Sequence, residues 1–142
     1  MNGLSAFLPQ NAIRAENQKH VVSARFLDKD NKPMVWETRV IASSEYEAIK
    51  SGCMKRIPVP GKKGMYTSDL DTEKLFSQLV AKCTVFPDLN NAELQDAYGV
   101  MGAEKLARAM LLPGEFDEYV GRIQEWHGFS TDFDELVDDA KN

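Results

Sequence analysis

The sequence predicts an α+β fold, predominantly α-helical, with an N-terminal β-hairpin at about residues 20–42 followed by five to six short helices. Two runs rich in β-branched and aromatic residues flank a turn of Asp, Asn, Lys and Pro, which is typical of a hairpin. Beyond residue 42, apolar residues recur at helical spacing between prolines and glycines. A chain of 142 residues is most simply one domain, which we expect to span 1–142.

Residues 1–18 are predicted to form an N-terminal arm. Leu4, Phe7 and Leu8 have the spacing of one short amphipathic helical turn, and the proline directly after them stops it. The polar residues 11–18 are typical of a linker that leads into the hairpin.

Residues 19–42 are predicted to pair as an antiparallel hairpin, with HVVSARFL and MVWETRVIA on either side of DKDNKP. The side chains indicate a register in which Phe26 faces Trp36 on one side of the ladder and Arg25 faces Glu37 on the other. A one-residue slip would turn Trp36 to the wrong face. We therefore expect this register to be well specified and Trp36 to be buried.

The helical part is predicted to span 43–142, and a capping box opens its first helix. Ser44 and Glu47 have the spacing at which each side chain bonds the backbone of the other. This helix is expected to reach Arg56, where two prolines follow. A second helix is expected to begin near Ser68–Asp71, with a buried stripe of Leu75, Phe76, Leu79, Val80 and Cys83.

Three further helices and a short acidic tail helix are predicted after these. Asn90 and Glu93 cap the third helix, and Gly99 ends it. Gly102 precedes the fourth, and Pro113 suits the first position of the fifth, where its missing N–H is no loss. The expected stripes are Leu106, Ala107, Met110 and Leu111 in the fourth helix, and Phe116, Tyr119, Val120, Ile123 and Trp126 in the fifth.

Basic and acidic residues are unevenly distributed along the chain. Up to Thr67 there are 11 basic and 6 acidic residues, and beyond it 6 basic and 16 acidic, so the two parts carry +5 and −10 within a net charge of −5. Such asymmetry predicts two different partner surfaces, or attraction between one part and the other.

A compact basic loop, KRIPVPGKKGMYT, is predicted at 55–67 between the first two helices. Its Gly61–Gly64 stretch differs from a phosphate-binding loop, because a predicted helix precedes it and no Ser or Thr follows the GK pair. Two interpretations stay open: a solvated excursion between helices, or a surface that meets acidic groups on a partner or on a second copy. The candidate partner-binding residues are Lys55, Arg56, Lys62, Lys63 and Tyr66.

Six aromatic and methionine residues are predicted to be core contacts because of their helical spacing: Tyr98, Met101, Met110, Phe116, Tyr119 and Trp126. Any of them that are exposed would instead form an adaptable apolar patch suited to a segment of another protein.

Catalysis and metal binding find no support in the sequence. Cys53 and Cys83 are far apart, and His20 and His127 have no partner at metal-ligand spacing. No nucleophile–base pair is evident either. We therefore predict no catalytic residue, no cofactor-binding residue and no metal ligand, and a protein that is not an enzyme.

Membrane and secretory roles are not predicted. No apolar run approaches the ~20 residues of a membrane span. The start, MNGLSAFLPQNAI, lacks the basic and long apolar segments of a signal peptide. We expect a cytoplasmic protein.

Four stretches together carry a family resemblance: LSAFLPQN, KRIPVPGKKGMYT, ELQDAYGVMGAEKLARAMLLPGEFDEYV and DELVDDAKN. In this order they resemble the XkdN-like tail assembly chaperones of long-tailed phages and defective prophages of Gram-positive bacteria. The likeness extends over nearly the whole chain, and no single motif in it is catalytic.

The resemblance implies a non-enzymatic tail assembly chaperone in the host bacterial cytoplasm, not expected in the mature virion. Such a protein is expected to hold the long tape measure protein soluble and to recruit tail tube subunits around it. The two halves of opposite charge also allow self-association, whereas neither nucleic acid nor membrane is an expected partner. The family supplies no residue-level site for this chain.

The alternative function is a nucleic-acid-associated regulatory or adaptor protein that uses the basic N-terminal half. The pI of about 5.1 and the lack of a recognition motif argue against it.

The last three residues, Ala140-Lys141-Asn142, can be encoded with A AAA AAC, a heptamer on which ribosomes slip back by one base. Tail assembly chaperones of this general type are often made in two lengths by such a slip. Our hypothesis is that this chain is a short form and that a longer form continues in the −1 frame.

Overall fold

The computed structural model describes residues 3–129 and confirms the α+β class. A 3-10 helix, η1, comes first at Gly3–Phe7. The strands are β1 Gln18–His20, β2 Trp36–Thr38, β3 Met54–Pro58, β4 Tyr66–Leu70 and β5 Thr84–Phe86. The α-helices are α1 Ser43–Ser51, α2 Thr72–Cys83, α3 Ala92–Ala97, α4 Ala103–Met110 and α5 Pro113–Trp126.

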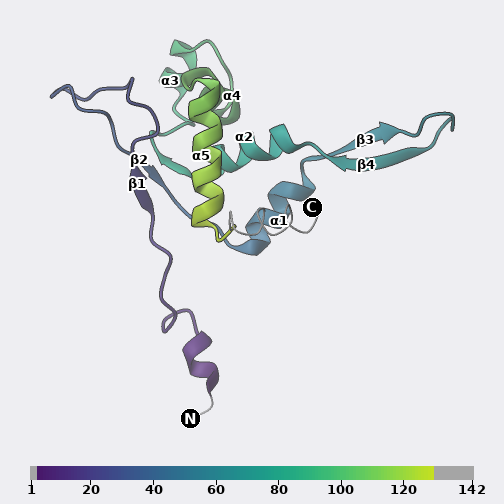
Figure 1. Cartoon of the computed structure of the whole chain (residues 1–142), viewed down its shortest axis with the longest axis horizontal. Helices are drawn as coiled ribbons and strands as arrows, with labels where there is room; N and C mark the ends of the chain where they lie inside the picture. Colours follow the sequence, from purple (N-terminus) through teal and green to yellow (C-terminus); the bar gives the residue numbers. More distant parts are fainter. Residues whose placement is uncertain (1–2, 130–142) are drawn as a thin grey trace, which may run out of the picture.

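The strands form two separate sheets. β1, β2 and β5 make an antiparallel sheet in that order, which we call the body sheet, and β3 and β4 make an antiparallel pair of their own. Figure 1 shows the β3–β4 hairpin and the N-terminal arm leaving the body in different directions. α2, α4 and α5 pack on one another beside the body sheet, α1 packs on α2, and the arm and the hairpin extend from this centre.

The main core lies where the body sheet, α2, α4 and α5 meet. Trp36 and Tyr119 are each 1% exposed, and their rings meet edge to face with centroids 5.6 Å apart. The Tyr119 hydroxyl lies 2.6 Å from Thr38 Oγ1 and 2.8 Å from Thr84 Oγ1, which ties α5 to two strands. The predicted burial of Trp36 is confirmed. The buried cluster contains Trp36, Val80, Cys83, Leu89, Leu106, Ala107, Met110, Leu111, Phe116, Tyr119, Val120 and Ile123.

A second, smaller cluster packs α1 against α2. Its buried members are Ile49, Cys53, Leu75 and Leu79. Ile41 and Phe76 touch both clusters, so the two cores are continuous. Arg108 of α4 also binds neighbouring helices together: its Nε donates to Ser77 Oγ at 2.6 Å, and its guanidinium lies 4.2 Å from the Phe116 ring centroid.

The predicted register of the N-terminal hairpin is wrong, although β1 and β2 do pair antiparallel. Trp36 lies opposite His20 instead of Phe26, and the predicted pairing of Arg25 with Glu37 is not formed. The ladder ends at His20 because the chain then leaves the sheet and crosses to the start of α5. Cross-strand pairing therefore competes with a tertiary contact that the local sequence does not reveal.

The predicted turn at DKDNKP is present beyond this excursion. The carbonyl of Phe26 accepts a hydrogen bond from the N–H of Met34 at 2.7 Å, and the N–H of Asp28 donates to the carbonyl of Lys32 at 2.8 Å. Asn31 has a φ of 61°, a left-handed conformation that Asn tolerates well in turns.

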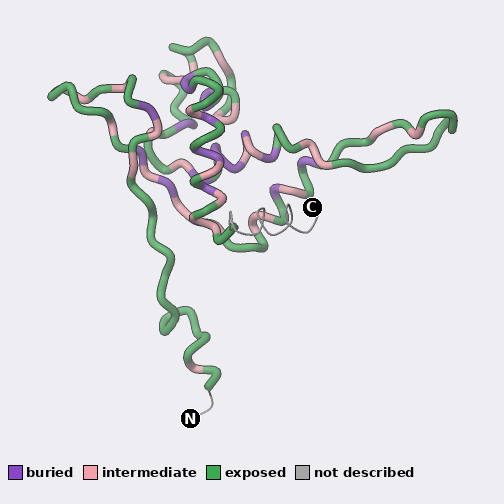
Figure 2. Tube along the Cα trace, in the orientation of Figure 1, coloured by how far each residue is buried: buried purple, intermediate pink, exposed green. Residues whose placement is uncertain are grey.

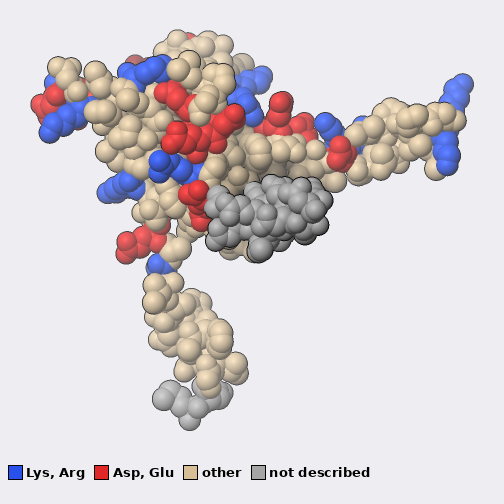
Figure 3. Space-filling model, viewed as in Figure 1, with Lys and Arg blue, Asp and Glu red and all other residues tan. Residues whose placement is uncertain are grey.

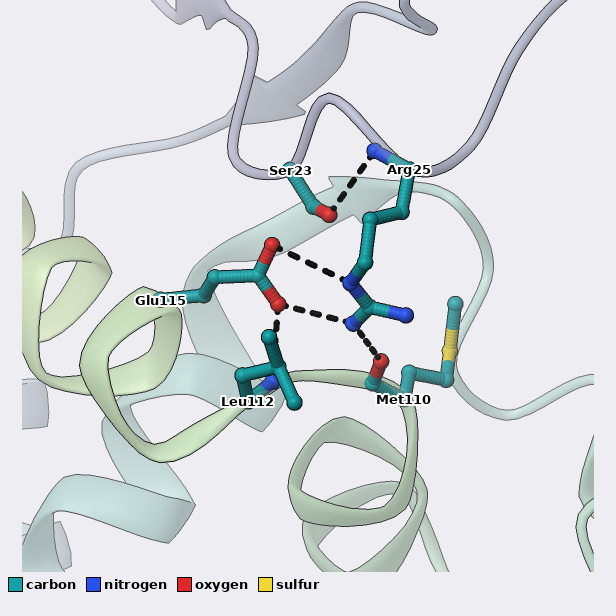
Figure 4. A network of polar contacts seen from close by, with 5 residues as sticks. All are labelled: Ser23, Arg25, Met110, Leu112 and Glu115. Atoms are coloured by element: carbon teal, nitrogen blue, oxygen red, sulfur yellow. Dashed lines mark hydrogen bonds and ion pairs between the residues drawn. The ribbon is translucent and has the colours of Figure 1, made fainter.

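Arg25 is engaged with the connection between α4 and α5 (Figure 4). Its Nη2 donates to Glu115 Oε1 at 2.7 Å and to the Met110 carbonyl at 2.8 Å. Glu115 Oε1 also accepts from the N–H of Leu112 at 2.8 Å, which is one half of a capping box. The backbone N–H of Arg25 donates to Ser23 Oγ at 3.2 Å. This network fixes the chain that follows β1 on the helical body.

The ionised Glu115 carboxylate is expected to stabilise the fold, so the free energy of unfolding should fall in acid. The hydrogen bond from Arg25 lowers the pKa of the Glu115 carboxyl from 4.5 to about 2 in the folded protein. Because the folded pKa lies below the unfolded one, this stabilisation is complete above about pH 5 and disappears as the pH falls toward 2. Denaturant unfolding of the wild type and of Glu115→Gln should therefore differ at neutral pH and converge as the pH falls to about 2. A difference that persists unchanged at that pH would contradict this role.

The first helix is shorter than predicted. Its N-cap is Ala42, whose side chain accepts no hydrogen bond, so the predicted capping box of Ser44 and Glu47 is wrong. The helix ends at Ser51 instead of Arg56, because the chain pairs as a strand two residues after Gly52.

The predicted loop at 55–67 is a β-hairpin in the structure. Ile57, Tyr66 and Thr67 are good strand formers, and they lie on β3 and β4. Pro58, which looked like a helix stop, ends β3. Proline is compatible with this place because both strands are edge strands. Prolines fit a loop and an edge strand equally well, which explains the error.

The helices of the second half lie close to their predicted places. Asn91, one residue after the predicted cap, accepts from the N–H of Leu94 at 2.8 Å. Gly99 follows α3 with a φ of 67°, and Pro113 is the first residue of α5, as predicted. Strand β5 was not predicted, because its three residues follow α2 directly without a turn.

Four of the six residues predicted as core contacts pack in or against the main cluster: Met110, Phe116, Tyr119 and Trp126. The prediction is wrong for Tyr98 and Met101, which are 39% and 85% exposed. Both lie in the segment that joins α3 to α4.

No helix among residues 3–129 is long and apolar enough to cross a membrane. The predicted tail helix from Thr131 and the ending Lys141-Asn142 lie outside the described residues.

Candidate partner-binding site

The candidate site is the β3–β4 hairpin, which is anchored to the body at its base. The N–H of Asp71 donates to the carbonyl of Cys53 at 2.8 Å and closes the base. Leu70 packs against the buried cluster that contains Cys53. Asp71 then caps α2 by accepting from the N–H of Lys74 at 3.2 Å. The hairpin is thereby fixed where it runs into α2.

The hairpin is closed along its length by a regular ladder. Five residue pairs join β3 to β4. The N–H of Val59 continues the ladder by donating to the carbonyl of Met65 at 3.0 Å. Gly61 and Gly64 have φ values of 77° and 80°, a left-handed conformation that glycine adopts without steric cost. The two glycines therefore let the chain reverse at the tip.

The structure places the five predicted binding residues at two levels of this hairpin. Lys55 and Arg56 lie on β3 and Tyr66 on β4, whereas Lys62 and Lys63 lie in the turn. The Cζ of Arg56 is 4.1 Å from the Tyr66 ring centroid, so these two side chains share one face. Lys55 projects from the other face, because successive residues of a strand alternate.

The hairpin exposes both apolar and basic side chains. Met54, Met65 and Tyr66 are 47%, 53% and 52% exposed. On β3 and β4 the residues are exposed except Ile57 and Leu70, which are half-buried. Figure 2 shows the hairpin as mostly exposed, and Figure 3 shows basic side chains at its far end. This surface combines apolar contact area with positive charge.

Such a hairpin is suited to bind another protein. A two-stranded hairpin is marginally stable alone in water, so a partner that covers one face would stabilise it. No third strand pairs with β3 or β4 among residues 3–129, so their outer edges can pair with an extended segment. The Gly61–Gly64 turn joins two strands, whereas a phosphate-binding loop leads from a strand into a helix.

The N-terminal arm is a second exposed surface, and it is not among the sites predicted from the sequence. Leu4, Phe7 and Ile13 are 67%, 81% and 100% exposed. Residues 3–13 contain no charged side chain, so the arm lacks what normally keeps a free segment hydrated. The signal that could have revealed it was this apolar, uncharged composition.

The thiols and imidazoles have structural surroundings. Burial raises the pKa of the Cys83 thiol to about 11, and burial lowers the pKa of His20, whose ring lies 4.7 Å from the Trp126 ring. His127 Nε2 accepts the N–H of Ile41 at 3.0 Å. Within the part of the chain that the structure describes, no group of three or more His, Cys, Asp or Glu could hold a metal ion.

The chain as a whole has relatives among known proteins. The family model for the phage XkdN-like tail assembly chaperone protein matches residues 4–141. The phage-like element PBSX protein XkdN of Bacillus subtilis (strain 168) is 26% identical over 140 residues, which cover 98% of this chain and 93% of that protein. YqbN of the same strain, described as uncharacterized, is 26% identical with the same coverage.

The fold also has a counterpart among solved structures. The crystal structure of YqbN matches with a TM-score of 0.74 at 22% sequence identity, over 92% of this chain and 99% of that one. At this identity the likeness speaks for the fold. The family model, in contrast, covers nearly the whole chain. The chain therefore belongs to the XkdN-like family of phage tail assembly chaperones.

Proposed function

We propose that this protein acts in tail morphogenesis without catalysis, by binding the tape measure protein and recruiting tail tube subunits around it. It does so in the host cytoplasm and is absent from the finished particle. The observation that carries the proposal is the β3–β4 hairpin, which leaves the body and exposes apolar and basic side chains together. Family membership supplies the morphogenetic setting.

The chemistry of the hairpin fits a long, aggregation-prone client. Exposed apolar patches cause aggregation, and covering them with another protein prevents it. Met54 and Met65 have flexible, polarizable side chains that adapt to irregular apolar surfaces. Lys62 and Lys63 at the tip attract acidic groups and speed the first encounter. The hairpin would thus select apolar segments that are flanked by acidic residues.

Co-expression with the tape measure protein of the same phage or prophage tests the proposal. The tape measure protein should be recovered in the soluble fraction with this chain and in the pellet without it. A tagged form of this chain should also capture the tape measure protein and the tube subunit. An insoluble tape measure protein in both cultures would contradict the proposal.

The rival nucleic-acid function predicts a different result for the isolated chain. A nucleic-acid binder would be retained on heparin at low salt and would shift a labelled duplex, because phosphate contacts dominate such binding. We expect neither retention on heparin nor a duplex shift, since the net charge is −5 and the chain outside the four basic residues of the hairpin is acidic overall. Tight duplex binding at physiological salt would favour the rival.

A further inference from the structure

The N-terminal arm has an apolar surface that residues 3–129 of its own chain leave uncovered. Leu4, Phe7 and Leu8 are 67%, 81% and 45% exposed, and η1 has no buried residue. Figure 1 shows the arm leading away from the body, and Figure 3 shows no charged side chain on its outer part, in agreement with the uncharged sequence of residues 3–13. An uncharged segment with three large apolar side chains gains free energy by docking on an apolar surface.

The outer face of the body sheet exposes apolar side chains beside one ion pair, in which Lys19 Nζ lies 3.8 Å from Glu37 Oε1. Glu37 lies opposite both Lys19 and Phe86, so these three side chains form a row across the sheet, on the face away from Trp36 and α5. The register between β2 and β5 shifts between Glu37 and Thr38. A bulge of this kind can turn a side chain to the other face of a sheet. This brings Phe86 to the outer face.

Apolar area is exposed on that face around a shallow hollow. Val35 and Phe86 are 48% and 47% exposed. The hollow has a volume of about 350 Å³ and is lined by Lys19, Val35, Trp36, Glu37 and Phe86. That volume accommodates one or two large apolar side chains.

The free edge of β1 links the arm to this hollow. β1 is an outer strand of the body sheet, so one of its edges has no strand beside it among the described residues. The arm leaves β1 at Gln18, whereas the hollow lies at the other end, where His20 faces Trp36. The arm therefore leads away from the hollow of its own chain.

When the β1 edges of two copies pair antiparallel, the arm of each copy lies at the end of the sheet where the other copy has its hollow. Each arm then runs past the His20 end of the other copy, toward the hollow beside Val35 and Phe86. At strand-like extension residues 13–17 span about 16 Å, which is enough to carry η1 over a sheet whose strands are about 4.8 Å apart. A two-fold axis makes both exchanges identical, as in most homodimers.

We propose that two copies of this chain form a two-fold dimer in which the β1 edges pair antiparallel and each arm covers the outer sheet face of the other copy. The pairing removes an exposed strand edge, and the docking removes the apolar surfaces of the arm and the hollow from water. The dimer also presents two β3–β4 hairpins. It requires no phage partner, so it stands apart from the proposed chaperone function.

Sedimentation equilibrium of the full chain tests the dimer directly. The wild type should have twice the mass of the 16.0 kDa chain at micromolar concentration. The triple variant Leu4→Ser, Phe7→Ser, Leu8→Ser should raise the dimer dissociation constant at least about a hundredfold, because it removes the docked apolar surface. The triple variant should lose only the thermal stability that the dimer contacts contribute, so each monomer should still melt as a folded protein. Met101→Ser, which changes a residue that is 85% exposed elsewhere, serves as the control and should leave the mass unchanged.

Cysteine pairing tests where the arm lies. A chain with Phe7→Cys mixed with a chain with Val35→Cys should form a disulfide-linked heterodimer, and replacing the second chain by Met101→Cys should abolish it. Cys53 and Cys83 are both buried and do not compete. A monomeric wild type, a disulfide that forms within one chain carrying both changes, or a dimer that survives the triple variant would overturn the proposal. If the wild type is monomeric and the triple variant no longer captures the tape measure protein, the arm would instead be assigned to binding that protein.

Discussion

Replacing Trp36 by alanine is expected to lower the free energy of unfolding by about 3–5 kcal/mol. Trp36 is 1% exposed and packs edge to face on Tyr119, with ring centroids 5.6 Å apart. It lies on the middle strand of the body sheet, and the cavity left by its removal would open between the sheet and α5. The arm and the hairpin are extensions of this body, so the change is also expected to weaken every binding function.

Urea unfolding followed by far-UV circular dichroism measures this effect without relying on tryptophan fluorescence. Met101→Ala is the matched control, because Met101 is 85% exposed, and it should change the free energy of unfolding by less than about 0.5 kcal/mol. Equal midpoints for the two variants would show that Trp36 is not the centre of the core.

Replacing the four basic residues of the hairpin by serine is expected to abolish most partner capture while the fold persists. The variant changes Lys55, Arg56, Lys62 and Lys63, which lie on an exposed hairpin outside both buried clusters. Its melting temperature should stay within a few degrees of the wild type, since exposed charges contribute little to stability. Capture of the tape measure protein should fall by about tenfold or more, because charge complementarity governs both encounter and register.

The control variant removes the same number of positive charges elsewhere. Lys29, Lys32, Lys82 and Lys105 are exposed residues outside the hairpin, and their replacement by serine gives the same net charge. If binding depends on the hairpin, the control should capture the tape measure protein like the wild type. Equal losses in both variants would mean that overall charge, and not this surface, governs binding.

The fold was predictable where one local signal decides the structure. Pro113 at the start of α5, Gly99 after α3 and the apolar stripe of α5 each follow from a single backbone or spacing requirement. Trp36 was correctly expected to be buried from the alternation of side chains along its strand, although its expected partner Phe26 was wrong.

The register of β1 with β2 was not predictable from pairing preferences. The sequence offers Arg25 a carboxylate across the ladder at Glu37, but the chain brings it to Glu115. That contact joins residues 90 positions apart and also satisfies the Leu112 N–H and the Met110 carbonyl. A pairing pattern within 20 residues contains no information about a competing contact that lies 90 positions away in the sequence.

The segment that carries the candidate site was predicted as a loop, and the structure shows a hairpin. Pro58 and two glycines led to this error, and partner binding by the four basic residues and Tyr66 stays a prediction. The structure adds that Arg56 and Tyr66 share one face, which requires strand alternation and pairing. The arm was passed over because a short apolar turn next to a proline resembles a minor local feature.

Site-specific photo-crosslinking from the hairpin decides whether this surface contacts the tape measure protein. A photoreactive residue would replace Tyr66, or Lys29 as the control, in cells that produce phage tails. Both positions are exposed, but only the first lies on the β3–β4 hairpin. We predict a covalent adduct with the tape measure protein from position 66 and none from position 29. Adducts of nucleic acid at position 66, or tape measure adducts from position 29 alone, would show that the hairpin is not the surface that binds the tape measure protein.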